Sequence, residues 1–352
     1  MLENLRIPII LAPMIGASSF DMALAVSRAG GLGTLAGGAL PPDEIEAQAA
    51  RMRGTAAAPF AINLLITEPA RPSAEAVDAA IERLRPWYEA RGLEPPAAPN
   101  DYAPDFAAQF AALLRAAPPA ASFTFSILRA EQVEALRSAG TLVVGTATTA
   151  AEARAWAEVG ADAICAQGFE AGGHRGHFLG GPEESLVGTF ALVATIRQAV
   201  GLPVIAAGGI MDGRGVAAAL ALGAVAAQMG TAFLLADQTA ISRPWRRALE
   251  TAGDEPTRLT RAFTGRPARG VENDFMRQMR AVEAEVPAYP VQNRLTQPLR
   301  AAAAQMDDPQ AISLWAGQGL RLARGGEAGA MVEAWWDEAR VAAQALAKRT
   351  AD

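Results

Sequence analysis

The sequence predicts an α/β fold, a closed (β/α)8 TIM barrel with an additional helical cap, and two observations carry this prediction. Short, continuously apolar runs recur, as in the strands of a parallel sheet whose outer face is covered. Most are followed by Ala-rich segments with helical spacing that end in Ala-Gly or Val-Gly, where glycine suits the left-handed residue at a helix end. Eight such units match a barrel. The predicted strands are 8–12, 32–36, 60–64, 122–127, 141–145, 163–167, 203–207 and 225–229.

The alternative fold is an open, doubly wound sheet. Its glycine fingerprint, GxGxxG, should lead from the first strand into a helix. The glycines of GGLGTLAGG, residues 30–38, have a different spacing and lie within and after the second predicted strand. The barrel is therefore the preferred prediction.

Two regions fall outside the repeat of strand and helix. Residues 67–121 separate the third and fourth predicted strands, and their prolines exclude one long helix, so we expect helices joined by rigid turns over one barrel rim. After residue 237 the alternation stops, and the sequence looks helical to its end. The predicted barrel therefore comprises residues 1–66 and 122–240, and the helical cap or extension comprises residues 67–121 and 241–352.

The composition indicates a large apolar core and argues against a polyanionic partner. The chain has 352 residues, of which 51% are hydrophobic, and its net charge is −6. This negative charge argues against nucleic acid or an anionic membrane surface as partner. The one cysteine excludes an intramolecular disulfide and fits a reducing cytoplasm. Glu3 stands where a signal peptide carries basic charge, so the N-terminus is interpreted as a first strand.

One stretch, residues 215–236, has the length of a membrane helix. It is mostly Ala and Gly, and Gly223 and Gly230 lie where turns would fall. A helix, a turn and a buried strand explain it better than a membrane span.

The strand ends are where a (β/α)8 barrel carries its chemistry, and several reaction classes lack the residues they need there. The one lysine, Lys348, lies near the C-terminus, so no lysine is placed to form a Schiff base. No group of carboxylates at the strand ends could hold magnesium. Cys165 lies inside a predicted strand and is expected to be a buried core residue.

Two glycine turns follow the last two predicted strands, AAGGI at 206–210 and QMGT at 228–231. The backbone N–H groups of Gly209, Gly230 and Thr231 could bind a phosphate there, or the glycines could only close tight turns. At two earlier strand ends, the amides of Asn63 and Gln167 can donate and accept hydrogen bonds. They suit the edge of a flavin ring, or they could cap loop backbone.

Both histidines of the chain lie in AQGFEAGGHRGHF, residues 166–178, on a glycine-rich loop that can approach a ligand closely. His174 is the candidate catalytic residue, as a general base or a hydrogen-bond donor, because imidazole has an unperturbed pKa near ~6.5. His177 is expected to lie in the loop behind it. The alternatives are a structural His174 and a His-x-x-His metal site completed by Glu170 or Glu183, which the loop's glycines disfavour. We otherwise expect Glu170 to tie the loop to the barrel rim.

The runs LAPM, FAINLL, AQGFEAGGHRG, PVIAAGGI and AAQMGTAF, followed by FTGRPARG, resemble the nitronate monooxygenase (2-nitropropane dioxygenase) family of FMN-dependent barrels. The resemblance runs from about residue 5 to 275 and continues in SLWAGQG, residues 313–319. It implies that His174 is catalytic. It also implies an FMN site formed by Asn63, Gln167, Gly172, Gly209, Gln228, Met229, Gly230 and Thr231. Met14, at the end of the first predicted strand, is expected to belong to the same site.

This resemblance implies a flavoenzyme that oxidises alkyl nitronates or nitroalkanes with O2 to carbonyl compounds and nitrite. From the residues we expect it to be cytoplasmic and to bind no metal. The flavin would do the redox chemistry, and the protein would position and polarise the substrate. One alternative is an NAD(P)H-dependent FMN reductase of the same fold, acting on a quinone or an enoyl thioester. Another is a flavin-binding protein without catalytic activity. The physiological substrate and the oligomeric state stay open.

The chain departs from the family pattern at two places. Family members often have a proline where this chain has Phe20, and phenylalanine-glycine-leucine-proline where it has FSIL, residues 125–128. Both departures are expected on the substrate side of the site.

Overall fold

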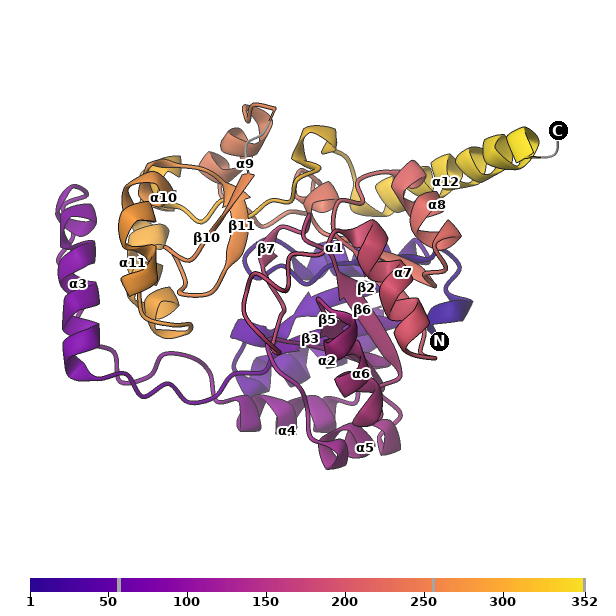
Figure 1. The fold of residues 1–352 in the computed structure, drawn as a ribbon, viewed down its shortest axis with the longest axis horizontal. Helices are drawn as coiled ribbons and strands as arrows, with labels where there is room; N and C mark the ends of the chain where they lie inside the picture. Colours follow the sequence, from indigo (N-terminus) through magenta and orange to yellow (C-terminus); the bar gives the residue numbers. More distant parts are fainter. Residues whose placement is uncertain (56–57, 255–256, 351–352) are drawn as a thin grey trace.

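The computed structural model describes residues 1–55, 58–254 and 257–350, and its centre is a barrel of eight parallel strands (Figure 1). The strand order is β1-β9-β8-β6-β5-β4-β3-β2, and a parallel bridge between Ile10 and Leu32 joins the two ends of this sheet. The predicted (β/α)8 fold is thus confirmed. The strands are β1 Ile9–Leu11, β2 Gly33–Ala36, β3 Phe60–Leu65, β4 Ala120–Thr124, β5 Leu142–Ala147, β6 Ala163–Gln167, β8 Val204–Ala207 and β9 Ala226–Met229.

Helices cover the outer face of the barrel, and polar side chains cap several of their N-termini. Ser19, Thr149 and Asp212 each accept a hydrogen bond from a backbone N–H in the first turn of the following helix. Outward apolar strand residues such as Leu11 and Phe123 are fully buried beneath the helices. The helices of this layer are α1 Phe20–Arg28, α2 Pro42–Thr55, α4 Phe106–Ala116, α5 Ala130–Ser138, α6 Ala150–Glu158, α7 Thr189–Ala199 and α8 Gly213–Ala221.

The stretch 215–236 forms most of α8, then β9 and a short 3-10 helix, η3 Thr231–Phe233, as predicted. In the described part of the chain, no helix combines the length and apolarity needed to cross a membrane.

The alternation of side chains along each strand separates the barrel interior into an apolar floor and a polar upper layer. The floor is a cluster of small apolar residues, and Leu2 of the 3-10 helix η1 Leu2–Asn4 packs with it. Further along the same inward rows come polar side chains, so the open end of the barrel is polar. These side chains are Asn63, Ser122, Thr124, Thr146, Gln167 and Gln228.

The prediction that the chain is helical after residue 237 is wrong in one segment. β10 Thr257–Thr260 and β11 Ala268–Val271 form an antiparallel sheet with β7 Gly173–His174 (Figure 1). These strands are short, carry Arg and Gly, and pair with residues nearly 100 positions earlier, so local periodicity does not reveal them. The other elements of this part are α9 Arg243–Glu250, α10 Asp274–Met279, α11 Val291–Gln305, α12 Ala328–Thr350 and the 3-10 segments η4 Arg280–Glu285, η5 Pro309–Ala311 and η6 Leu320–Leu322.

Residues 67–121 divide between two surroundings. The helix α3 Ala74–Glu89 lies beside α11 (Figure 1), and the hydroxyl of Tyr88 donates to the carbonyl of Leu295 at 2.6 Å. By contrast, α4 packs against α2 on the barrel, and β4 begins at Ala120 and ends three residues before the predicted end. The division into barrel and cap stays a prediction, with α3 and α11 as the core of the proposed cap.

Candidate active site

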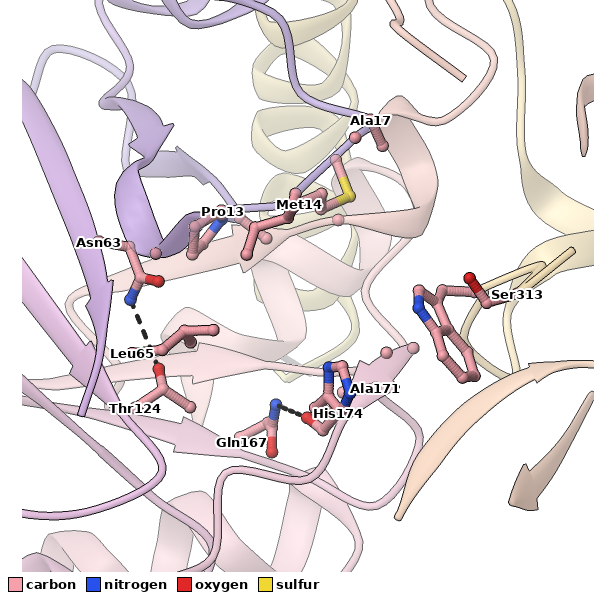
Figure 2. A pocket seen from close by; sticks show the side chains of 18 of the residues that line it. Pro13, Met14, Ala17, Asn63, Leu65, Thr124, Gln167, Ala171, His174 and Ser313 are labelled. Atoms are coloured by element: carbon pink, nitrogen blue, oxygen red, sulfur yellow. Dashed lines mark hydrogen bonds between the residues drawn. The ribbon is translucent and has the colours of Figure 1, made fainter. Parts of the chain in front are cut away.

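A cavity of about 700 Å³ opens at the carboxyl ends of the barrel strands, beneath the C-terminal third of the chain. Its size lies within the usual range of ligand sites. Figure 2 shows Asn63, Gln167, His174 and Met14 facing it from different strand ends. Nine of the ten residues predicted for the site line this cavity: Met14, Asn63, Gln167, Gly172, His174, Gly209, Gln228, Gly230 and Thr231.

The structure does not bring the side chain of Met229 to the cavity. On β9 the side chain of Gln228 points into the barrel, so the next side chain points outward, and Met229 is 1% exposed within the outer core. Phe20, which was expected on the substrate side, lies away from the cavity. This residue begins α1, and its ring packs beneath the guanidinium of Arg51, 3.7 Å from the ring centroid, outside the cavity lining. The other departure from the family pattern does reach the cavity, through Phe125.

His174 lies on β7, and three aromatic rings surround its imidazole. Phe125, Tyr289 and Trp315 have ring centroids 5.4, 5.7 and 5.6 Å from the centroid of the imidazole. Its Nε2 lies 3.0 Å from the hydroxyl of Thr264. Burial, and then the positive charges of Arg266 and Arg300, lower the pKa of His174 from 6.5 to about 3. The ring is therefore neutral at neutral pH.

The amide of Gln167 holds the histidine loop against the barrel (Figure 2). Its Nε2 donates to the carbonyl of His174 at 3.0 Å, and its Oε1 accepts from the N–H of Gly176 at 2.8 Å. Gln167 therefore caps the backbone of the histidine loop, which was the alternative to a role at the flavin edge. The amide of Asn63 donates to the carbonyl and hydroxyl of Ser122 at 3.1 and 3.0 Å, which fixes its orientation at the cavity wall.

The predicted role of Glu170 is confirmed. Its carboxylate accepts hydrogen bonds from the N–H and hydroxyl of Thr189, and its carbonyl accepts from the N–H of Gln318. A Cβ at Gly172 would lie 2.5 Å from the backbone nitrogen of Gly317. Glycine at this position therefore allows the histidine loop to lie directly against the backbone of the SLWAGQG segment.

His177 does not line the cavity. Its carbonyl accepts a hydrogen bond from Arg266, and its Nδ1 is buried and has no hydrogen-bond partner among the described residues. Burial, followed by the charge of Arg266, lowers the pKa of His177 to about 4. Over the described ranges of the chain, no three His, Cys, Asp or Glu side chains are grouped as a metal would require.

Cys165 is 2% exposed in the barrel floor, and burial raises the pKa of its thiol to about 12. This confirms the prediction of a buried core residue, because a thiol with this pKa does not form a reactive thiolate at neutral pH.

A guanidinium without a carboxylate partner lies at the cavity wall. Arg300 on α11 donates to the carbonyl and side-chain oxygen of Asn293 at 2.9 and 2.8 Å and to the hydroxyl of Ser313 at 3.4 Å. None of the ion pairs found among the described residues involves Arg300. Burial lowers its pKa to about 10, so it stays charged at neutral pH. An anion in the cavity would therefore meet an unneutralised positive charge.

Backbone N–H groups of two turns at the cavity indicate a second possible anion site. Gly209 has φ +73°, which favours glycine, and no described residue accepts a hydrogen bond from the N–H of Gly209, Gly230 or Thr231. A Cβ at Gly230 would lie 3.2 Å from the Cβ of Ala12 and 3.4 Å from the sulfur of Met14. The hydroxyl of Thr231 accepts from the N–H of Gly317 at 2.8 Å, which joins this turn to the SLWAGQG segment.

Sequence reasoning missed the residues that the C-terminal third contributes. Thr264, Tyr289, Arg300 and Trp315 line the cavity around His174. Two of them lie in segments that carried the family resemblance, FTGRPARG and SLWAGQG, but no role had been derived for either. These two motifs could have indicated Thr264 and Trp315 as site residues. The sequence around Tyr289 and Arg300 matches no motif that would place either residue at the site.

Comparison with known proteins gives one consistent family. The nitronate monooxygenase family model matches residues 2–337. A protein of Staphylococcus saprophyticus named "Probable nitronate monooxygenase" is 37% identical over 334 residues, 94% of each chain. A protein of the same name from Staphylococcus aureus strain Newman is 38% identical over 322 residues, 91% of this chain and 90% of the relative.

Solved structures show the same arrangement. The structure of nitroalkane oxidase from Streptomyces ansochromogenes is 42% identical, with a TM-score of 0.91, and the match covers 98% of this chain and 99% of the other. That of FabK from Thermotoga maritima is 28% identical, with a TM-score of 0.76, and the match covers 99% and 98%. The family-model match over nearly the whole chain and these full-length relatives indicate the same family as the histidine loop at the mouth of the barrel. The chain is an oxidoreductase that belongs to the nitronate monooxygenase family.

Proposed function

We propose that this protein is an FMN-dependent nitronate monooxygenase, which oxidises alkyl nitronates with O2 to carbonyl compounds and nitrite. The observation that carries the proposal is the neutral imidazole of His174 at the cavity wall, with a positive guanidinium nearby and aromatic rings around it. A neutral imidazole can accept a proton from carbon or donate a hydrogen bond to a nitro group.

The residues present fit FMN. The unpartnered N–H groups of Gly209, Gly230 and Thr231 are suitable donors to a phosphate, and Glu170 orders the loop beside them. Asn63, Gln167 and Gln228 present amides along the barrel mouth, suitable for the polar edge of an isoalloxazine ring. When bound, FMN would supply the electron transfer that oxidation of the substrate requires.

The protein's own groups would act on the substrate in three ways. Arg300 would attract and bind the anionic nitronate, because its charge has no carboxylate partner among the described residues. The rings of Phe125, Tyr289 and Trp315 would limit the access of water. His174 would take the α-proton of a neutral nitroalkane, or hydrogen-bond to a preformed nitronate.

An anaerobic mixing experiment tests this proposal against the reductase alternative. The purified protein is mixed separately with NADH, NADPH and ethyl nitronate, and flavin bleaching is followed by stopped-flow absorbance. We expect the nitronate to change the flavin spectrum, and nitrite to form once O2 is admitted. Rapid bleaching by NADH or NADPH, with no response to nitronate, would support the reductase. A flavin that responds to none of them would indicate a protein that only binds flavin.

A further inference from the structure

The side chain of Thr264 contacts the imidazole ring of His174. Thr264 is 1% exposed, lines the cavity, and has its Oγ1 3.0 Å from Nε2 of His174. No described residue hydrogen-bonds to the other ring nitrogen, Nδ1. A neutral imidazole carries its proton on one nitrogen and a lone pair on the other. The partner of Nε2 therefore determines which nitrogen is free to act on a substrate.

Counting donors and acceptors around Oγ1 identifies the tautomer. The same oxygen lies 3.1 Å from the carbonyl of Arg266, which can only accept, and 3.4 Å from the N–H of Arg266, which can only donate. A hydroxyl has one proton and two lone pairs. If the hydroxyl of Thr264 donates its proton to the carbonyl of Arg266, its Oγ1 can only accept in its other two contacts. The N–H of Arg266 and Nε2 of His174 must then both donate, so Nε2 carries the hydrogen. In the opposite tautomer the hydroxyl proton would go to Nε2, and the contact between Oγ1 and the carbonyl of Arg266 would have no hydrogen, so the Nε2–H tautomer satisfies one more hydrogen bond.

We infer that Thr264 is a positioning residue, which holds His174 as the Nε2–H tautomer and leaves Nδ1 as the nitrogen that takes the substrate's α-proton. The inference rests on the proposed function for the identity of the substrate. The contacts that establish the tautomer do not depend on it.

The fold holds this contact in place. β11 pairs with β7, with Ala268 opposite His174, so the turn before β11 is brought to the edge of the imidazole. Gly265 in that turn has φ +79°, and a Cβ there would lie 2.0 Å from the carbonyl oxygen of Pro287. The aromatic rings around His174 leave its plane little freedom to rotate.

The proton transfer balances without another reactant. The Cα–H bond of the nitroalkane breaks, and its electron pair stays on the substrate, delocalised into the nitro group as the nitronate. The proton forms a new N–H bond at Nδ1, which makes the imidazolium. Nε2–H remains bonded to Oγ1 of Thr264 throughout, so the threonine neither gains nor loses a proton.

Nuclear magnetic resonance tests the tautomer directly. The chain has two histidines, so protein labelled with ¹³C,¹⁵N-histidine gives two imidazole spin systems, and the variant His177→Gln identifies that of His174. Couplings between the ring nitrogens and ring protons show which nitrogen carries hydrogen. At pH 7.5, with flavin as purified, we expect the proton on Nε2. A proton on Nδ1, or an even mixture of tautomers, overturns the inference.

A matched pair of variants tests whether Thr264 is responsible. Thr264→Val keeps the shape but loses the hydroxyl, whereas Thr264→Ser keeps the hydroxyl. We expect a mixture of tautomers in the valine variant and Nε2–H in the serine variant. If the tautomer of His174 is unchanged in Thr264→Val, the Thr264 hydroxyl does not determine it, and the proposed role of Thr264 is rejected. If the valine variant does not fold, the comparison of Thr264→Ser and Thr264→Ala decides in the same way.

Turnover adds a second measurement. Loss of a group that orients a functional histidine typically costs about 10- to 100-fold. We expect kcat with neutral nitroethane to fall by about that factor in Thr264→Val, with flavin content unchanged and with a smaller loss for preformed ethyl nitronate. Equal losses with both substrates contradict Nδ1 as the base. A wild-type protein that shows the Nε2–H tautomer but oxidises neither compound would refute the proposed function and leave the tautomer intact.

Discussion

The buried, neutral state of His174 predicts a loss of stability at moderately acidic pH. In the unfolded chain, imidazole takes up a proton as the pH falls through 6.5, whereas in the folded protein the pKa of His174 is about 3. Between these values the unfolded state binds more protons, so folding becomes less favourable as the pH falls. At pH 5.0 the solution is about 1.5 pH units below the pKa of an unfolded histidine. The free energy of unfolding is therefore lower at pH 5.0 than at pH 7.5 by about 2 kcal/mol.

The variant His174→Gln removes this contribution, because glutamine does not titrate. For a chain of 352 residues, about 2 kcal/mol corresponds to a Tm difference of roughly 3 °C. We therefore expect wild type to lose about 3 °C more than His174→Gln between pH 7.5 and 5.0.

The assay is thermal unfolding followed by circular dichroism at both pH values, with flavin saturating. His177→Gln is a useful comparison, because the folded pKa of His177 is about 4, and it should give a shift of similar size. If wild type and His174→Gln lose the same Tm, His174 is not held neutral by the fold. In that case the argument for a neutral base at this position fails.

Four further predictions concern the flavin and the substrate. Heat should release FMN and not FAD, because the turns after β8 and β9 offer backbone N–H groups suited to one phosphate. Chromatography of the released cofactor decides, and FAD would contradict the proposed site. Gly209→Glu should weaken FMN binding by about 10- to 100-fold through the loss of a charge-assisted contact worth about 1.5–3 kcal/mol, measured by fluorescence titration of the apoprotein. The control Gly201→Glu, at a glycine with open space around it, should bind FMN normally, and equal affinities would remove the phosphate assignment. His174→Ala should lower turnover of nitroethane by about 10²–10⁴-fold with FMN retained, whereas His177→Ala should change it by less than about tenfold. If both variants produce nitrite at the wild-type rate, the histidine loop has only a structural role. Arg300→Met should raise the KM for ethyl nitronate by about 10- to 100-fold and that for neutral nitroethane much less, so equal KM changes would argue against an anion-binding role.

The sequence predicts the barrel well because each of its units is local. Every apolar run and the helix after it can be interpreted within about 30 residues, and the glycine turns adjoin the strands that position them. Side-chain alternation along β9 also explains why Gln228 reaches the cavity and Met229 does not, and this distinction could have been drawn from the sequence.

The rest of the site depends on pairing between distant segments. His174 meets Thr264 only because β7 pairs with β11, and nothing local in either segment encodes this pairing. The reason for glycine at 172 is likewise a backbone contact with residue 317. Arg300 lies on an ordinary amphipathic helix, so only the folded chain shows that its guanidinium faces a cavity.

The pairing of β7 with β11 also bears on the order in which the cavity is completed during synthesis. A nascent chain that has emerged as far as residue 240 already contains all eight barrel strands and the glycine turns. It still lacks Thr264, Tyr289, Arg300 and Trp315, so its histidine loop has no β11 to pair with and His174 lacks its contact with Thr264. Since chains fold from the N-terminus as they are made, the barrel strands are available before the segments that enclose His174. The last third of the chain therefore completes the cavity around His174, and a product truncated at residue 240 would lack that part of the cavity wall.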